Sequence, residues 1–168
     1  MLFERVNNMG NIILKEMSLQ DYNDYTEAAI SNYTEELLLS GRFKNYNEAL
    51  DFSKLEYYDV FKDGFKTKDI FLYNINLLKE SIGIIWFIKE KNWGFIGDFL
   101  IYKEYRGNKH GYNTLKLLEG KAKEYGIKEL RLGVFKHNLN AIKLYLKVGY
   151  TILKDGNKNY IMAKKLNL

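Results

Sequence analysis

Hydrophobic and polar positions recur along the first third of the chain in patterns that predict one strand and two helices. The expected elements are a strand at 12–17 and helices at about 19–40 and 46–63. Gly41 and Gly64 stand where the two helices should end, as glycines commonly do. We therefore expect residues 1–68 to form a mostly helical region.

A strongly hydrophobic stretch follows a predicted strand from Asp69 to Ile75. Residues 82–88 are apolar at both parities, which is typical of a strand buried on both faces. One parity holds Ile82, Ile84, Trp86 and Ile88, and the other holds Gly83, Ile85 and Phe87. Residues 89–92 should then turn the chain back as a hairpin.

The partner strand is expected from Trp93 to about Ile101. Strict alternation would place its side chains on two opposite faces. The first face holds Trp93, Phe95, Phe99 and Ile101, and the second holds Ile96, Asp98 and Leu100. Asp98 is thus a carboxylate inside a hydrophobic strand, where it is either hydrogen-bonded for structural reasons or part of a site.

The C-terminal third predicts a helix, a strand, a second helix and a closing hairpin. After a loop at 102–110, apolar residues recur at helical spacing until Gly126 ends the helix. Asn138 is well placed to cap a short helix that Gly149 ends. Further strands are expected at about 130–134, 150–154 and 159–165, with a hairpin turn at 155–157.

These elements together predict an α/β fold with one domain over residues 1–168. We expect a mixed, mostly antiparallel sheet of about six or seven strands, flanked by about four helices. The sheet and the main site should lie within residues 69–165.

The amino-acid composition limits the kinds of site that the protein can contain. The chain has no cysteine and only two histidines, so it lacks thiolate ligands and cysteine nucleophiles, and we expect no metal. No apolar run approaches the ~20 residues of a membrane span, and the start of the chain lacks the basic-then-apolar pattern of a secretory signal. We expect a cytoplasmic protein that makes no membrane contact.

The formal net charge of +5 is unevenly distributed. Residues 1–100 hold 11 Lys+Arg against 16 Asp+Glu, a balance of −5, whereas residues 101–168 hold 15 against 5, a balance of +10. Such a split suits a protein that binds a polyanion and a small cation. Nucleic-acid binding is an alternative, but the basic residues are scattered over helix faces and turns, and we expect no nucleic-acid partner.

The loop Arg106–Gly111 carries the clearest chemical signal. It joins a strand to a helix N-terminus, where unpaired backbone N–H groups and the helix dipole favour a phosphate. Arg106 and Lys109 add positive charge. Because glycines in such a loop also serve simply to turn the chain, the loop alone leaves both interpretations open.

Residues 105–111, Y-R-G-N-K-H-G, resemble the signature of the GNAT superfamily of N-acetyltransferases: Arg or Gln, two residues, Gly, one residue, then Gly or Ala. Residues 134–150, V-F-K-H-N-L-N-A-I-K-L-Y-L-K-V-G-Y, resemble the second cofactor segment of that family. The resemblance covers about residues 69–165. In two departures from the family pattern, Lys109 replaces the first signature glycine, and Lys103 stands where the family often has proline.

The resemblance implies a GNAT-like fold and transfer of an acetyl group from acetyl-coenzyme A to an amine, by direct attack in a ternary complex. The pantetheine arm would pair with the backbone at the end of the central strand, and the pyrophosphate would lie on the amides of the loop. The implied cofactor-binding residues are Leu100, Ile101, Arg106, Gly107, Asn108, Lys109, His110, Gly111, Tyr112, Asn138, Ala141 and Tyr145.

Tyr145 and Asp98 are the candidate catalytic residues. Tyr145 matches the tyrosine that often protonates the departing thiolate in this family, although its place on an apolar helix stripe is also typical of a core tyrosine. Asp98 is the candidate base, with Glu104 second, while a structural carboxylate and proton transfer to water are alternatives. Four other residues, His110, His137, Trp86 and Trp93, are expected to be solvated or packed rather than catalytic.

By the same resemblance, residues 19–65 should face the acceptor. This region is acidic, with Glu35 and Glu36 near the end of the first helix, and favours a small-molecule or peptide amine, in particular a cationic one. We expect a monomer or a homodimer. The alternative function is a non-catalytic coenzyme A-binding module, which the unusual Lys109 keeps open.

Overall fold

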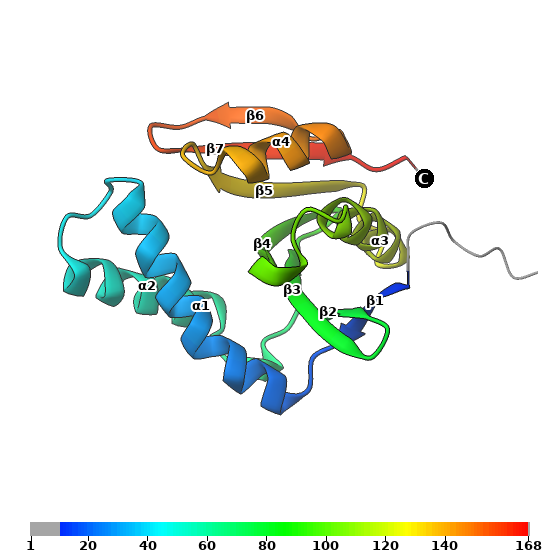
Figure 1. The fold of residues 1–168 in the computed structure, drawn as a ribbon, viewed down its shortest axis with the longest axis horizontal. Coiled ribbons are helices and arrows are strands. Elements are labelled where there is room, and N and C mark those ends of the chain that lie inside the picture. Colours follow the sequence, from blue (N-terminus) through cyan, green and yellow to red (C-terminus); the bar gives the residue numbers. More distant parts are fainter. Residues whose placement is uncertain (1–10, 168) are drawn as a thin grey trace, which may run out of the picture.

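The computed structural model describes residues 11–167, which form a seven-stranded mixed sheet with helices on both faces (Figure 1). The strands are β1 (Ile12–Glu16), β2 (Ile70–Leu77), β3 (Glu80–Lys89), β4 (Trp93–Ile101), β5 (Glu129–Phe135), β6 (Thr151–Asp155) and β7 (Asn159–Lys165). The helices are α1 (Leu19–Leu39), α2 (Tyr46–Val60), α3 (His110–Glu124) and α4 (Leu139–Val148). The expected α/β architecture is confirmed.

The strand order is β1-β2-β3-β4-β5-β7-β6, and every neighbouring pair is antiparallel except β4 and β5. The parallel pair is connected through α3, as a parallel crossover requires. In the described chain, β4 and β5 pair only over Trp93–Ile96 and Glu129–Leu132. Beyond these residues the two strands diverge, and we call this divergence the fork.

Side-chain caps fix the starts of three helices. Ser18 and Asp21 form a capping box at the start of α1. The side chain of Asn45 accepts a hydrogen bond from the Glu48 N–H at the start of α2, and Asn138 accepts one from the Ala141 N–H at 3.2 Å at the start of α4. The predicted cap at Asn138 is therefore confirmed.

Several element boundaries differ from the expected ones by one to three residues, and two of these differences have a clear structural reason. Helix α2 ends at Val60 rather than at 63, because Phe61 leaves the helical conformation and packs its ring against Trp86, with centroids 5.1 Å apart. Strand β2 runs to Leu77 rather than to Ile75, because it pairs with β1 along its whole second half.

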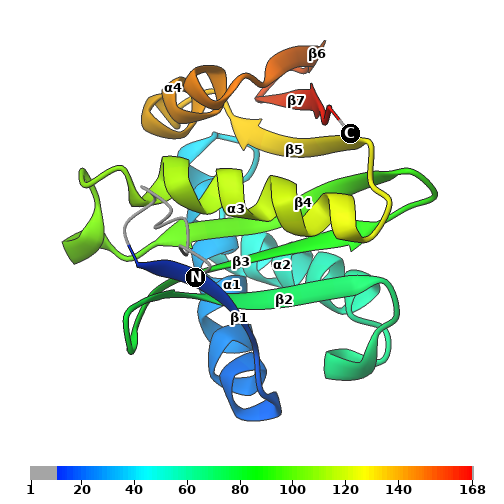
Figure 2. The same ribbon diagram turned by 90° about the vertical axis from the view of Figure 1, so that its right-hand side faces the viewer.

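The sheet separates two hydrophobic cores. A pair of helices lies on each side of it (Figure 2). Helices α3 and α4 cover one face, where Leu115, Leu118 and Tyr145 join the larger core. Helices α1 and α2 cover the opposite face, where Tyr22 and Trp86 join a smaller, aromatic core. We call the side of the sheet covered by α3 and α4 the α3 face, and the side covered by α1 and α2 the α1 face.

Two β-bulges overturn the strict alternation expected in the central hairpin. Ile75 pairs with Gly83 but Asn76 pairs with Ser81, so Ile82 is an extra residue and belongs to the α3-face core, away from Ile84. The expectation that these two residues share a face was wrong. A bulge of this kind reverses the parity of every residue beyond it.

The second bulge lies at Gly97. Trp86 pairs with Asp98 while Phe87 pairs with Ile96, which leaves Gly97 unpaired. Ile96 consequently packs in the α3-face core together with Phe99, whereas the sequence pattern had placed them on opposite faces. Glycine is required here because an added Cβ would lie 1.9 Å from the ring of Trp86.

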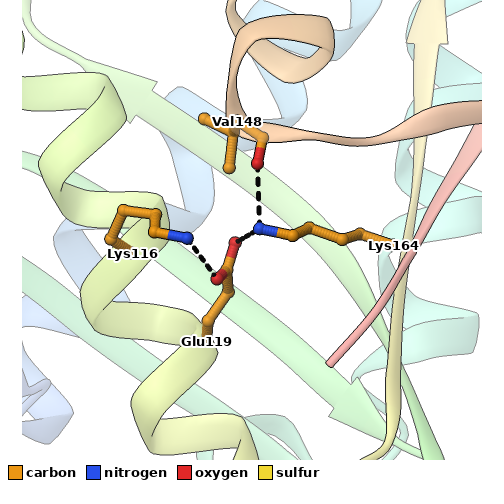
Figure 3. Close-up of polar contacts among 4 residues, drawn as sticks. All are labelled: Lys116, Glu119, Val148 and Lys164. Carbon is orange, nitrogen blue, oxygen red and sulfur yellow. Dashed lines mark hydrogen bonds and ion pairs between the residues drawn. The ribbon is translucent and has the colours of Figure 1, made fainter. Parts of the chain in front are cut away.

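A buried ionic cluster ties α3, α4 and β7 together (Figure 3). The Glu119 carboxylate on α3 accepts hydrogen bonds from Lys116 at 2.9 Å and from Lys164 of β7 at 2.6 Å. Lys164 also donates to the Val148 carbonyl at 2.8 Å, where a cation complements the C-terminal end of α4. This cluster fixes the position of α4 relative to the fork.

Candidate functional site

The fork leaves one edge of β4 unpaired with β5. Leu100 and Ile101 keep their other edge on β3, where they pair with Ile84 and Gly83. The contact is close, since a Cβ on Gly83 would lie 2.1 Å from the Leu100 carbonyl oxygen. A rigid strand end with one available edge can pair with an extended, amide-containing ligand.

The loop at the end of β4 leads directly into α3. After the 3₁₀ turn Lys103–Tyr105, Gly107 and Lys109 both adopt left-handed conformations, with φ of 85° and 62°. Helix α3 then begins at His110 without a side-chain cap. Its first N–H groups therefore lack the partner that a capping side chain would supply, which suits them to an anion.

Lys109 adopts the left-handed backbone conformation that glycine favours. A left-handed lysine costs about 1 kcal/mol relative to glycine, because its Cβ crowds the following carbonyl. The loop thus holds a left-handed residue just before α3 and carries a positive charge there.

Arg106 braces the loop rather than extending from it. Its Nε donates a hydrogen bond to the Ile101 carbonyl at 2.9 Å and so ties the loop to the last residue of β4. Gly111, in the first turn of α3, lies against α4, where an added Cβ would be 2.9 Å from the Leu144 side chain. Asn108 is exposed, and His110, Tyr112 and Ala141 are partly buried around the same helix ends.

Asp98 lies on the α1 face of β4, at the fork. Its carboxylate accepts a hydrogen bond of 2.6 Å from the Tyr25 hydroxyl, and none of the ion pairs among the described residues includes it. Burial raises the pKa of Asp98, and hydrogen bonds from Tyr25 and the Phe99 N–H oppose the rise. The proton affinity of Asp98 is therefore set by the balance between burial and these two hydrogen bonds.

Tyr145 approaches the fork from α4, on the opposite face of the sheet. It is buried beside Tyr150, with ring centroids 5.9 Å apart. Burial raises the pKa of Tyr145, and the charge of Asp98 raises it further. The two candidate catalytic residues thus interact electrostatically through the fork, although they belong to different faces.

Several other predicted residues lie elsewhere. Glu104, the second candidate base, is exposed in the 3₁₀ turn. His137, expected to be solvated, pairs with Glu36 of α1 at 2.7 Å and stacks on Phe135. The oxygen of Asn138 is engaged in capping α4.

Sequence reasoning missed Tyr25 and left Trp86 outside the site. Tyr25 belongs to an α1 stripe with Ala29, Tyr33 and Glu36, which recur at helical spacing and lie against the fork side of the sheet. Gly97, which interrupts the hydrophobic strand next to Asp98, was a signal for the bulge that brings Trp86 opposite Asp98.

The sequence matches the model of the acetyltransferase (GNAT) family over residues 31–150. A curated relative, YycN of Bacillus subtilis (strain 168), described as an uncharacterized N-acetyltransferase, is 30% identical over 160 residues, which are 92% of this chain and 99% of that protein. The chain therefore belongs to the GNAT acetyltransferase family.

Solved structures have a similar fold. The crystal structure of YycN has a TM-score of 0.83 at 29% identity and covers 86% of this chain and 95% of its own. PaiA N-acetyltransferase from Thermoplasma acidophilum, solved in complex with coenzyme A, has a TM-score of 0.71 at 21% identity over 92% of this chain and 98% of its own. Spermidine N-acetyltransferase from Vibrio cholerae, solved with coenzyme A and spermine, has a TM-score of 0.67 at 15% identity over 93% and 96%.

Residues 11–167 show neither a cluster of potential metal ligands nor a membrane-spanning helix. These residues contain no group of three or more His, Cys, Asp or Glu side chains arranged to hold a metal ion. Among the same residues, every helix is too short or too polar to cross a membrane.

Proposed function

We propose that the protein transfers an acetyl group from acetyl-coenzyme A to the nitrogen of a small-molecule or peptide amine, by direct attack within a ternary complex. One observation carries the proposal: the fork combines a loop that leads into an uncapped helix start with Asp98 and Tyr145, which approach it from opposite faces of the sheet. Family membership and the description of YycN as an N-acetyltransferase support the reaction type.

The residues around the fork fit the coenzyme. Lys109 and the uncapped start of α3 suit a pyrophosphate, and Gly107 leaves the loop open, because an added Cβ there meets nothing within 4 Å. The available edge at Leu100 and Ile101 suits an amide-rich pantetheine arm. When bound, the cosubstrate supplies an activated thioester. The coenzyme A complex of PaiA supports this assignment.

Asp98 and Tyr145 have complementary roles in this proposal. Asp98 accepts the proton released as the amine nitrogen bonds to the acetyl carbon. Tyr145 donates its proton to the sulfur as the carbon–sulfur bond breaks, and its raised pKa keeps it protonated at neutral pH. Direct attack is favoured because the chain has no cysteine to carry the acetyl group.

A cationic amine is the preferred acceptor. Residues 19–65 hold 10 Asp+Glu against 4 Lys+Arg, and their two helices cover the face of the sheet on which Asp98 lies. Opposite charge on this face would raise the local concentration of a cation. The spermine complex of the Vibrio cholerae neighbour supports the same preference.

The test is release of coenzyme A thiol from acetyl-coenzyme A across a panel of polyamines, aminosugars, amino acids and peptides. Because the chain has no cysteine, the protein contributes no background thiol. We expect turnover with at least one cationic amine. Calorimetric binding of acetyl-coenzyme A without turnover on the whole panel would favour the non-catalytic module, and preference for an anionic acceptor would overturn the charge argument.

A further inference from the structure

A chain of hydrogen bonds crosses from β3 through α1 to β4. The indole Nε1–H of Trp86 donates to the Tyr25 hydroxyl at 2.8 Å, and that hydroxyl donates to the Asp98 carboxylate at 2.6 Å. Trp86 and Asp98 are 61 and 73 positions away from Tyr25 in the sequence, so the three residues meet only in the folded protein.

The direction of this chain is determined by its first member. An indole N–H can only donate, so the Tyr25 oxygen accepts from Trp86 and its single hydrogen is directed to another acceptor. That acceptor is Asp98, and a donated hydrogen bond stabilises the ionised carboxylate. The bulge at Gly97 completes the arrangement, because it sets Trp86 opposite Asp98.

We propose that Tyr25 is a positioning residue, which Trp86 orients so that it holds Asp98 ionised and directed toward the fork. This inference rests on the proposed role of Asp98 as the acceptor of the amine proton. Burial and the negative charge of Asp98 both raise the pKa of Tyr25 well above the usual range, so its hydroxyl stays protonated and remains a donor to Asp98.

The electrostatic surroundings of Asp98 make the inference testable. Three tyrosines belong to these surroundings: Tyr25 of α1 acts on Asp98 directly, Tyr145 of α4 is affected by the charge of Asp98, and Tyr57 of α2 acts on Tyr25. Each of these is a neutral phenol at neutral pH, because burial raises each pKa. The Tyr25 hydroxyl is thus the donor whose removal changes the proton affinity of Asp98 most directly.

The experiment is Tyr25→Phe, which keeps the ring and removes the hydroxyl. We expect the apparent pKa of Asp98 to rise by about one unit, because the hydrogen bond that opposes the effect of burial is lost. Two measurements report the titration of Asp98. The first is the acid limb of the pH profile of kcat/KM. The second is carboxyl ¹³C NMR of the free protein labelled at aspartate, in which the Asp98 signal is identified by its absence from Asp98→Asn. On the acid limb the rate should fall about tenfold, and at higher pH it should return toward the wild-type value.

Tyr57→Phe is the matched control. Tyr57 also packs on the aromatic core and bonds through its hydroxyl, to Thr26 at 2.9 Å, but it does not contact Asp98. Its removal should leave the Asp98 titration unchanged. Trp86→Phe, which frees the direction of the Tyr25 hydroxyl, should shift the titration in the same direction by less than Tyr25→Phe.

The outcomes separate this inference from the proposed function. An Asp98 titration that is the same in wild type, Tyr25→Phe and Trp86→Phe would overturn the role of Tyr25, even if acetyl transfer is observed. A uniform loss of activity at every pH would do the same, because it indicates a merely structural tyrosine. If no amine is acetylated, the proposed function fails, while the NMR titration still decides whether Tyr25 controls Asp98.

Discussion

Asp98 on β4 and Glu119 on α3 are both carboxylates embedded in the protein, and they are partnered in opposite ways. Glu119 accepts hydrogen bonds from two ammonium groups, those of Lys116 and Lys164. Asp98 accepts hydrogen bonds from a neutral phenol and from the Phe99 N–H, and it enters no ion pair within the described residues. A carboxylate neutralised by fixed cations serves packing, whereas one held by neutral donors is available to an incoming cation.

The comparison is tested most strongly by Asp98→Asn. Loss of a general base lowers rates by about 10²–10⁴-fold, so we expect kcat/KM for the best amine to fall by that order. Calorimetric binding of acetyl-coenzyme A should stay near the wild-type value, since Asp98 lies on the α1 face, which the proposed function assigns to the acceptor.

The same substitution should not destabilise the protein at neutral pH. Burial raises the folded-state pKa of Asp98 above its unfolded value, so the folded state binds the proton more tightly. The corresponding stability is present below the unfolded pKa and is lost as pH rises through the folded one. Asparagine carries no charge and avoids this loss, so thermal unfolding should show an equal or higher Tm. A lower Tm with unchanged turnover would make Asp98 a structural residue.

Glu119→Gln should have the opposite profile. Removing one member of a buried ionic cluster costs about 3–5 kcal/mol in fully buried cases. The side chains of Glu119 and Lys164 are 10% and 17% exposed, but Lys116 is 35% exposed and can turn to water. We therefore expect unfolding in urea to show a loss of about 2–3 kcal/mol, with kcat nearly unchanged below the melting range.

Glu124→Gln provides the control on the same helix. Glu124 pairs with Lys121 at 3.0 Å, but both side chains are largely solvated, and such pairs contribute little. The free energy of unfolding should hardly change. If the two substitutions were equally harmless, the Glu119 cluster would not be the structural member of the comparison.

Tyr145→Phe examines the group that acts with Asp98. We expect kcat to fall roughly tenfold, because the departing sulfur loses its proton donor, while the Kd for coenzyme A stays nearly unchanged. Tyr150→Phe is a close control, since Tyr150 is buried beside Tyr145 and its hydroxyl has no hydrogen-bond partner among the described residues. Equal turnover in wild type and Tyr145→Phe would make Tyr145 a core residue.

The order of elements could be predicted from the sequence because its signals are local. Asn138 caps α4 through an N–H three residues away, and Gly149 ends the helix with a φ of 106°. Such features depend on neighbours within one helical turn. The loop Arg106–Gly111 was likewise recognisable, since its chemistry lies in consecutive residues.

The partners of Asp98 were not predictable in the same way. Simple hairpin counting from the turn after Lys89 places Trp86 opposite Gly97, and the bulge changes that partner to Asp98. The bond from Tyr25 spans 73 residues and depends on how α1 packs on the sheet. Tertiary packing of this kind leaves no periodic signal in the sequence.

The comparison between partnered and unpartnered charges also applies to two lysines, Lys164 and Lys109. Lys164 is held by Glu119, whereas Lys109 enters none of the ion pairs of residues 11–167. An unneutralised cation at the start of α3 should contribute to pyrophosphate binding. We expect Lys109→Ala to weaken acetyl-coenzyme A binding about fivefold at low salt, the effect of an exposed charge pair of about 1 kcal/mol.

Lys109→Gly separates charge from backbone strain. It should bind the coenzyme as weakly as Lys109→Ala, since both lack the ammonium group. Its stability should change by less than about 1 kcal/mol, because relief of the left-handed strain at φ 62° is offset by the greater freedom of glycine in the unfolded chain. Calorimetry at two salt concentrations measures the first effect and urea unfolding the second. If both variants bind the coenzyme as tightly as wild type, Lys109 serves only to turn the loop. The lack of an ionic partner would then not distinguish a functional charge from a structural one in this protein.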